Sequence, residues 1–225
     1  MSSSPSRNPA GEKAAPKAVV ARVGLYLRQL EIFRDQGRER VSSRELANAL
    51  NLRDAQVRKD LAHFGPFGHR GVGYRIDELI PSLRRILGVD RAWALGLVGA
   101  GNLGRALLRY RGFREQGFHI AAVFDNHPAI VGQPLEGLEI LPTERLDTTI
   151  KALGIELGVI CVPAEEAQKV ANSLVSGGVV GILNFAPASL TVPPHVEVVP
   201  VDLGIHLERL AYHVLNIRRG ISFAG

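Results

Sequence analysis

The segment AWALGLVGAGNLG, residues 92–104, determines how the larger part of this chain folds. Its first seven residues are apolar enough for a strand that is buried on both faces. The pattern G-x-G-x-x-G follows directly, and LGRALLRY continues with helical character. In such a loop Gly99 permits a tight turn, Gly101 lets a pyrophosphate approach the backbone, and Gly104 lets the helix pack on the strand. We therefore expect six consecutive residues to bind a dinucleotide: Gly99, Ala100, Gly101, Asn102, Leu103 and Gly104.

Further strands are predicted downstream of this loop. Apolar runs of strand length recur at residues 119–124, 157–162, 179–185 and 196–201, and residues 165–175 have helical periodicity. Strands that alternate with helices predict an α/β, Rossmann-like, doubly wound sheet. We assign residues 89–202 to this domain.

Asp125 ends the second predicted strand, 21 residues after Gly104. A carboxylate at that spacing accepts hydrogen bonds from a ribose 2′-hydroxyl and repels a 2′-phosphate. No Arg or Lys follows it immediately, so the sequence favours NADH and NAD+ over their phosphorylated forms. Residues at the ends of later strands are further candidates for this cofactor site: Val162, Pro163, Asn184, Ala186 and Pro187.

Some of these residues have a second interpretation. Pro163 either ends a strand or contacts the cofactor, and Asn184 either caps a loop or contacts the cofactor. Cys161 lies within an apolar strand, so we expect an inert core residue. As the only cysteine of the chain it excludes an intramolecular disulfide and an all-cysteine metal site, and we assign no metal ligands.

The first 88 residues hold most of the positive charge. They contain 16 Lys and Arg against 9 Asp and Glu, whereas residues 89–225 contain 11 against 13. A basic module beside a slightly acidic one suggests that the first part faces a polyanion, although charge alone also fits a solvated surface. We expect residues 1–17 to form a disordered arm and residues 18–88 to form the basic domain.

The basic domain has the pattern of a winged helix-turn-helix. Apolar spacing predicts a helix from residue 19 to about 34, and a capping box of Ser42 and Glu45 begins a second helix. Asp54 is the expected N-cap of a third helix. A glycine-bounded hairpin, the wing, is predicted over residues 65–74. Another helix precedes Gly88, and Pro81 is expected in or near its first turn.

Exposed side chains of this domain can contact DNA. Gln56 can pair with adenine, while Arg58 and Lys59 can contact phosphates or guanine. Arg70 in the wing can enter the minor groove or contact a phosphate. The candidate DNA-binding residues are Ser43, Gln56, Arg58, Lys59, Arg70 and Tyr74. Because a monomer reading a few base pairs would bind weakly, we expect a two-fold pair of subunits on a palindromic site.

The whole pattern after residue 17 resembles the Rex family of redox-sensing transcriptional repressors. The strings that carry the resemblance are Leu25-Tyr26-Leu27-Arg28, residues 56–61, residues 70–74, the glycine loop, Tyr110-x-Gly112-Phe113, residues 181–187 and Val201-Asp202. The resemblance implies a homodimer that binds double-stranded inverted-repeat operator DNA and releases it when NADH binds. It also implies that a trio, Arg28, Tyr110 and Asp202, couples the nicotinamide pocket to the DNA-binding domain. In that scheme the C-terminal helix, residues 203–225, is exchanged between subunits.

Other function classes stay open as alternatives. A DNA-binding regulator could sense another nucleotide such as CoA, since a fold does not fix its ligand. A small NAD-dependent oxidoreductase would need a substrate domain, and residues 91–202 are used by the nucleotide fold itself. We assign no catalytic residue, because no His is paired with a carboxylate at a telling spacing. With 46% hydrophobic residues, no apolar run of about 20 residues and no secretory signal pattern, we expect a cytoplasmic protein without a membrane segment.

Overall fold

The computed structural model describes residues 15–68 and 72–221. The chain divides at Arg91–Ala92 into two compact units, whereas the sequence predicted a boundary after residue 88. Most of the arm expected over residues 1–17 lies outside the described residues, and Lys17 is already helical.

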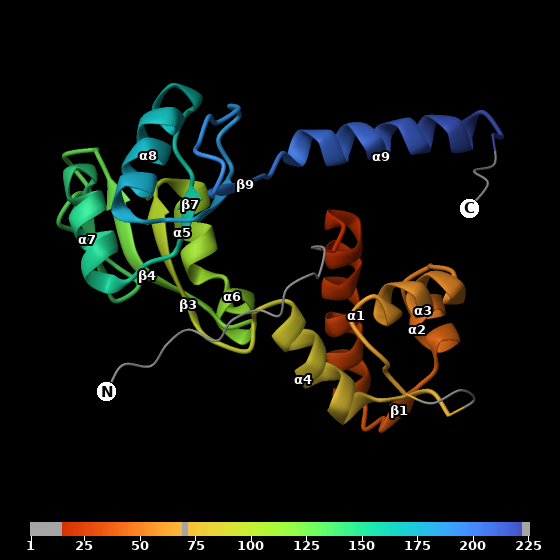
Figure 1. Cartoon of the computed structure of the whole chain (residues 1–225). Helices are drawn as coiled ribbons and strands as arrows, with labels where there is room; N and C mark the ends of the chain where they lie inside the picture. The colour runs from red at the N-terminus through yellow and green to blue at the C-terminus, as the bar shows by residue number, and fades with distance from the viewer. Residues whose placement is uncertain (1–14, 69–71, 222–225) are drawn as a thin grey trace, which may run out of the picture. The chain divides into compact units, whose positions relative to one another are not determined.

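The first unit is a helical domain with a two-stranded sheet (Figure 1). Its elements are α1 (Lys17–Asp35), β1 (Arg40–Val41), α2 (Ser43–Ala49), α3 (Asp54–Ala62), β2 (Tyr74–Arg75) and α4 (Ile76–Ile86). Apolar faces of the four helices meet in one core, in which Leu30, Leu46, Val57 and Leu83 are fully buried. The helices form because their apolar residues recur every three or four positions, which gives each of them one face to bury.

The start of α2 is confirmed, and the predicted start of α3 is wrong by one residue. Ser42 and Glu45 form the reciprocal capping box. In α3 the N-cap is Arg53, whose carbonyl accepts the amides of Gln56 and Val57. Asp54 is instead the first helical residue. There its negative charge still favours the N-terminal end of the helix dipole, and it pairs with Arg58 one turn later.

The wing differs from a simple hairpin. Residues Tyr74 and Arg75 pair in antiparallel register with Val41 and Arg40, which precede α2. The glycine-rich loop returns close to itself: a Cβ on Gly68 would lie 2.6 Å from the carbonyl oxygen of Gly73. The strand that ends the wing therefore pairs with a distant segment that was not predicted as a strand.

Helix α4 contains Pro81 as its sixth residue, just past the first turn, and the sequence predicted it in or near that turn. Proline has no N–H, so the intrahelical bond to Asp77 is missing. Pro81 is exposed to solvent, where water can satisfy the carbonyl of Asp77.

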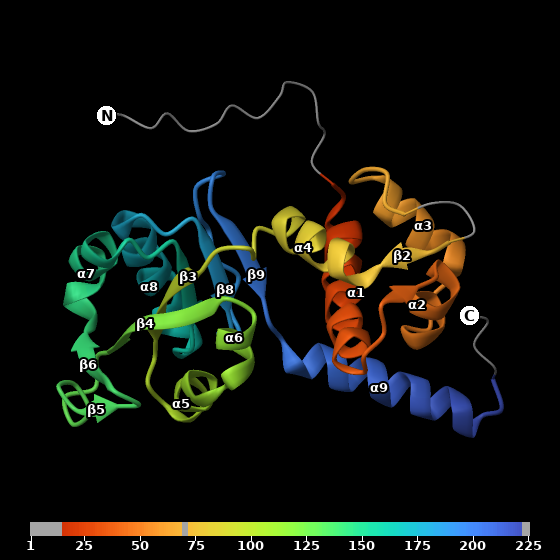
Figure 2. The same cartoon turned by 90° about the horizontal axis from the view of Figure 1, so that it is seen from below.

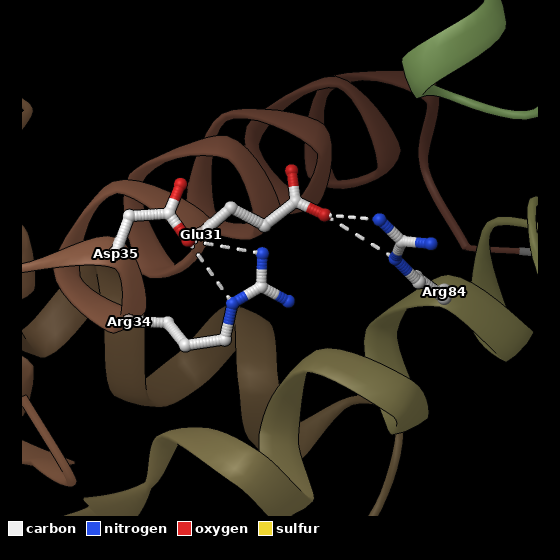
Figure 3. Close-up of polar contacts among 4 residues, drawn as sticks. All are labelled: Glu31, Arg34, Asp35 and Arg84. Atoms are coloured by element: carbon white, nitrogen blue, oxygen red, sulfur yellow. Dashed lines mark hydrogen bonds and ion pairs between the residues drawn. The ribbon is translucent and has the colours of Figure 1, made fainter. Parts of the chain in front are cut away.

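Helix α4 packs on α1, and an ion pair joins the two helices: Arg84 donates to Glu31 Oε1 at 2.5 and 3.2 Å. Figure 3 shows this ion pair beside a second one within α1, between Arg34 and Asp35.

The second unit contains the predicted doubly wound sheet (Figure 2). Its strands are β3 (Trp93–Val98), β4 (Phe118–Asp125), β5 (Pro134–Leu135), β6 (Leu138–Pro142), β7 (Leu157–Ile160), β8 (Gly181–Asn184) and β9 (Glu197–Pro200). They lie in the order β5-β6-β4-β3-β7-β8-β9, and all pairs are parallel except β5 with β6. Without β5, this is the 3-2-1-4-5-6 order of dinucleotide-binding sheets.

Helices cover both faces of the sheet. On one face α7 (Leu146–Leu153) and α8 (Ala164–Gly177) bury Ile150 and Leu174 against the strands. On the other face α5 (Asn102–Arg109) packs Leu107 and Leu108 on Leu97, and α6 (Arg111–Glu115) follows it. The crossover from β3 through α5 to β4 places the glycine loop at the carboxyl edge of the sheet, where ligands of such folds bind.

Helix α9 (Leu203–Arg218) follows the last strand. Most of its large apolar side chains are exposed, including Leu207 and Ile217 at 65% and 68%, and only Asn216 is buried. A helix this apolar with so little burial is unusual for a protein surface.

Candidate functional site

The glycine loop between β3 and α5 has the geometry that each of its glycines predicts. Gly99 has a φ of +100°, and a Cβ there would lie 2.5 Å from the carbonyl oxygen of Cys161. A Cβ on Gly104 would lie 1.9 Å from the carbonyl oxygen of Gly99. A Cβ on Gly101, by contrast, would meet no protein atom within 4 Å. Gly99 and Gly104 therefore allow the loop to form, while Gly101 keeps the space in front of it open.

Two charged side chains hold this loop from opposite sides. Asp125 Oδ2 accepts the Ala100 amide at 2.7 Å, and Oδ1 accepts the His127 amide at 2.8 Å. Arg105 Nε donates to the Ala100 carbonyl at 2.8 Å. Since a carboxylate has about four acceptor positions, Asp125 retains capacity for a ribose hydroxyl. The protein's own side chains therefore hold both the amide and the carbonyl of Ala100 by hydrogen bonds.

A cleft of about 610 Å³ lies at this edge of the sheet, within the volume range of small-molecule sites. Gly99, Gly101 and Asp125 line it, together with residues of α7 and α8. Its charged lining is mostly negative, with Asp125, Glu144, Asp147 and Glu166 against Lys169. Asn102 and Leu103 are exposed at the start of α5, where amide groups have no partner within the helix.

The candidates at the ends of later strands divide into two groups. Val162 and Pro163 line the cleft. Asn184, Ala186 and Pro187 are not among its lining residues. Asn184 is buried and holds its own loop, because its Nδ2 donates to the carbonyls of Ala186 and Ala188 at 3.2 and 2.9 Å and its Oδ1 accepts the Ala186 amide at 3.0 Å. Its role toward a cofactor stays a prediction.

Cys161 also lines the cleft, and burial raises the pKa of its thiol to about 12. At neutral pH such a thiol is protonated and a poor nucleophile.

The first unit brings several predicted DNA-binding residues together on α2 and α3. Arg58 Nη1 donates to Asp54 Oδ2 at 2.6 Å and to Ser43 Oγ at 3.2 Å, so one cation orients both helix starts. Lys59 is exposed on the same helix. Tyr74 is half-buried on β2 and packs against the core, where burial raises the pKa of its hydroxyl. Arg70 lies outside the described residues.

A buried carboxylate that the sequence analysis missed lies behind α3. Asp60 is 2% exposed and accepts four hydrogen bonds. Two come from Arg22, Nε to Oδ2 at 2.6 Å and Nη2 to Oδ1 at 2.9 Å. Tyr26 donates to Oδ2 at 2.7 Å, and Gln56 Nε2 donates to Oδ1 at 2.7 Å. This cluster joins α1 to α3 through charge as well as apolar packing.

The protonation states of the cluster follow from its contacts. Burial alone would raise the pKa of Asp60, but the hydrogen bonds from Arg22, Tyr26 and Gln56 outweigh it and hold the pKa below the usual range. Burial and the bond to Asp60 raise the pKa of Tyr26 far above its usual range. At neutral pH Asp60 is therefore ionised and Tyr26 is protonated.

The predicted coupling trio is distributed over both units. Arg28 is exposed on α1 of the first unit, and Tyr110 and Asp202 belong to the second unit. Tyr110 is 53% exposed, and its ring covers Gly112 and meets Phe113 edge to face, with 5.2 Å between the ring centroids. Asp202 Oδ1 accepts the Gly204 amide at 2.8 Å and caps α9. The role of the trio stays a prediction.

Within residues 15–68 and 72–221 no three His, Cys, Asp or Glu side chains gather as metal ligands would. No helix in the same ranges has the length and apolar content needed to cross a bilayer.

The sequence contains a signal for the missed cluster. Val57, Asp60, Leu61 and Phe64 follow the i, i+3, i+4, i+7 spacing of one helix face, so Asp60 falls on the inner side of α3. An acidic residue at such a position requires a partner. Arg22 and Tyr26 have the i, i+4 spacing that places both on one face of α1, but only the fold identifies them as those partners.

Comparisons with known proteins agree with both units. The family model described as CoA binding domain matches residues 90–188, and the model described as putative DNA-binding protein N-terminus matches residues 14–62. A solved structure of RSP, described as a Rex-family repressor, has a TM-score of 0.85 and 34% identity, and the match covers 92% of this chain and 96% of that chain. RSP in complex with beta-NAD+ and operator DNA gives 0.86, and RSP in complex with beta-NADH gives 0.84.

Curated relatives match along nearly the whole chain. The redox-sensing transcriptional repressor Rex of Solidesulfovibrio magneticus is 46% identical over 199 residues, which are 88% of this chain and 90% of the relative. The repressor of the same name from Carboxydothermus hydrogenoformans is 48% identical over 204 residues, which are 91% and 97% of the two chains. Both matches include the helical unit, the glycine loop and the sheet, and we conclude that this chain belongs to the Rex family of redox-sensing transcriptional repressors.

Proposed function

We propose that this chain represses transcription by binding operator DNA through its first unit, and that NADH binding to its second unit releases the DNA. The observation that carries the nucleotide half is the glycine loop: it is braced on both sides of Ala100, and the space in front of Gly101 is open. The DNA half is supported by the basic α2–α3 face and by the solved relative that holds operator DNA.

The cleft fits NADH and NAD+ better than their phosphorylated forms. The pyrophosphate lies against Gly101 and the first amides of α5, where the helix dipole favours negative charge. Asp125 accepts a ribose hydroxyl. Four carboxylates among the lining residues disfavour an additional 2′-phosphate.

The nucleotide controls DNA binding by preferring one conformation of the protein. NAD+ and NADH differ by one positive charge and by the planarity of the nicotinamide ring, and a ligand shifts an equilibrium only by its differential affinity for the two states. Arg28 and Asp202 form an ion pair in one arrangement and lose it in the other, with Tyr110 nearby. While Asp202 Oδ1 caps α9, its second oxygen can accept Arg28.

The DNA-binding form is a homodimer on an inverted repeat. A dimer supplies two α3 helices with two-fold symmetry, and a palindromic operator has the same symmetry. The exposed apolar side chains of α9 suit the exchange of this helix with a second copy of the chain. As a repressor the protein acts in the cytoplasm and catalyses no reaction of its own.

A second candidate ligand is CoA, because residues 90–188 match a CoA-binding family model. CoA resembles NADH in its adenosine and pyrophosphate but carries a 3′-phosphate and has no second ribose. The acidic lining of the cleft disfavours that additional phosphate.

Calorimetry with NADH, NAD+, NADPH and CoA, combined with gel shifts on a palindromic duplex, tests the proposal. We expect NADH to bind most tightly and to release the duplex, while NADPH and CoA bind weakly. Tight binding of CoA together with release of the duplex would favour the second candidate. A DNA affinity that none of the four ligands changes would contradict both candidates.

A further inference from the structure

Gln56 is the predicted base-reading residue of α3, but a side-chain amide reads a base only if its two ends are correctly oriented. Glutamine pairs with adenine when Oε1 accepts from the N6 amino group and Nε2 donates to N7. The reversed amide presents a donor to a donor and an acceptor to an acceptor. Something must therefore fix which end of Gln56 faces outward.

The buried side of Gln56 meets Asp60. The Gln56 Nε2 to Asp60 Oδ1 distance is 2.7 Å, and Asp60 is 2% exposed. An ionised carboxylate only accepts hydrogen bonds, so the group that faces it must be the NH2 end of the amide. This leaves Gln56 Oε1 directed away from Asp60, with one N–H of Nε2 still available beside it.

Asp60 itself has little freedom to move. Arg22 donates to both of its oxygens, and Tyr26 donates to Oδ2. With the bond from Gln56, these contacts use the approximately four acceptor positions of the carboxylate. Arg22 and Tyr26 of α1 therefore hold Asp60 in place, and Asp60 in turn holds the amide of Gln56.

We propose that Asp60 is a positioning residue for operator recognition, which acts through Gln56 by fixing the orientation of its amide toward adenine. This inference rests on the proposed function, since it assumes that α3 contacts DNA. Asp60 does not touch the DNA, and Arg58 and Lys59 supply charge on the same helix independently of it.

Asp60→Asn in the full-length protein tests this directly. Asparagine has one oxygen, which Arg22 Nε and Tyr26 hold at the position of Oδ2, so its NH2 group takes the place of Oδ1. There it meets the NH2 group of Gln56 and forces the Gln56 amide to reverse. The probe is a duplex that wild-type protein selects from a randomised inverted repeat, followed by every single-base change in that duplex. We expect Asp60→Asn to lose about 5- to 150-fold of discrimination at one position per half-site, the value of one bidentate base contact, and to keep it elsewhere.

Two further variants separate positioning from stability. Tyr26→Phe removes a bond to Asp60 Oδ2 but leaves Oδ1 and Gln56 untouched, so it lowers the unfolding temperature without changing base preference. In a Gln56→Ala background, Asp60→Asn produces no additional loss of discrimination. A uniform loss of affinity at all positions in either background would show a purely structural role and overturn the proposal.

If Asp60→Asn does not fold, NMR of the wild-type protein can show whether the Gln56 amide keeps its hydrogen bond to Asp60. The Gln56 side-chain amide must keep one proton protected from exchange with water, both free and on DNA, and rapid exchange of both protons would overturn the proposal. If the wild-type protein selects no DNA sequence at all, the proposed function fails and this inference fails with it. If it selects a sequence and Asp60→Asn reads that sequence equally well, only this inference fails.

Discussion

The two units hold their functional groups in opposite ways. In the first unit a long-range cluster of charged and polar side chains fixes α3, with Asp60 at its centre and Arg22 38 residues away along the chain. In the second unit the nucleotide loop depends on residues that have no side chain, at Gly99, Gly101 and Gly104. The first arrangement is sensitive to protons and to the loss of a charge. The second is sensitive to the addition of a single methyl group.

This difference has a practical consequence, because the units can be disturbed separately. Trp93 is the only tryptophan and starts β3 in the second unit, so its fluorescence reports the unfolding of that unit. Far-UV circular dichroism reports both units. Together, these two probes show whether a steric change or a charge change remains confined to one unit.

The largest effect is expected for Gly104→Ala. The new Cβ would lie 1.9 Å from the carbonyl oxygen of Gly99, so either the loop or α5 must move. We expect the second unit to lose about 3 kcal/mol of stability, the upper end of the usual cost of overpacking. Denaturant unfolding followed by Trp93 fluorescence measures it.

Gly101→Ala is the matched control for this change. Its methyl group meets no protein atom within 4 Å, so the unfolding midpoint should stay near wild type. NADH affinity should fall by about tenfold or more, because the methyl group occupies the space that the pyrophosphate needs. Two alanine variants with equal stability would contradict the steric account of the loop.

Asp60→Ala should produce the next largest effect, in the first unit. It removes the acceptor of four hydrogen bonds and leaves the guanidinium of Arg22 without its carboxylate. Because the side chain of Arg22 remains 25% exposed, we expect a loss of about 2–3 kcal/mol, below the 3–5 kcal/mol typical of a fully buried pair. Circular dichroism should reveal an earlier transition while the Trp93 transition is unchanged. A single transition shifted in both signals would show that the units do not unfold separately.

A smaller effect is expected from acid. The folded-state pKa of Asp60 is lowered, so its contribution to stability is complete above the ordinary carboxyl pKa of about 4 and is lost as the pH falls through the folded value. Urea midpoints by circular dichroism between pH 6 and pH 2.5 should therefore fall more steeply for wild type than for Asp60→Asn. Equal slopes would mean that Asp60 is not the titrating group.

The smallest effect concerns the ion pairs at the surface of α1. Glu31→Gln breaks the partly exposed pair with Arg84 on α4 and should cost about 0.5–1 kcal/mol (Figure 3). Asp35→Asn removes the more exposed pair with Arg34 and should leave thermal stability unchanged. If Asp35→Asn lowers the stability as much as Glu31→Gln does, solvent exposure does not decide how much these ion pairs contribute to stability.

The nucleotide half of the molecule was predictable because its signals are local. Strand β3, the three glycines and Asp125 fall within 33 residues and obey a fixed spacing, and the alternation of strands and helices predicts a doubly wound sheet. The acidic lining from α7 and α8 was not predicted, because it depends on how two helices meet over the sheet.

In the first unit, the features that were not predicted lie where segments distant in the sequence meet. The capping box at Ser42 is local and was predicted. The pairing of Tyr74 with Val41, and the bonds from Arg22 and Tyr26 to Asp60, join residues 33 to 38 positions apart. Pro81 lies just past the first turn of α4, at an exposed position where water can satisfy the carbonyl that loses its intrahelical bond.

The most direct test of the account is a titration of NADH by calorimetry, with and without the selected operator duplex. Linkage requires the operator to weaken NADH binding by the same factor by which NADH weakens operator binding. We predict a clear loss of NADH affinity when the duplex is present, and we predict that this loss disappears in Asp202→Ala. Equal NADH affinities in the presence and absence of the duplex would contradict the claim that the two ligands select different states of one protein.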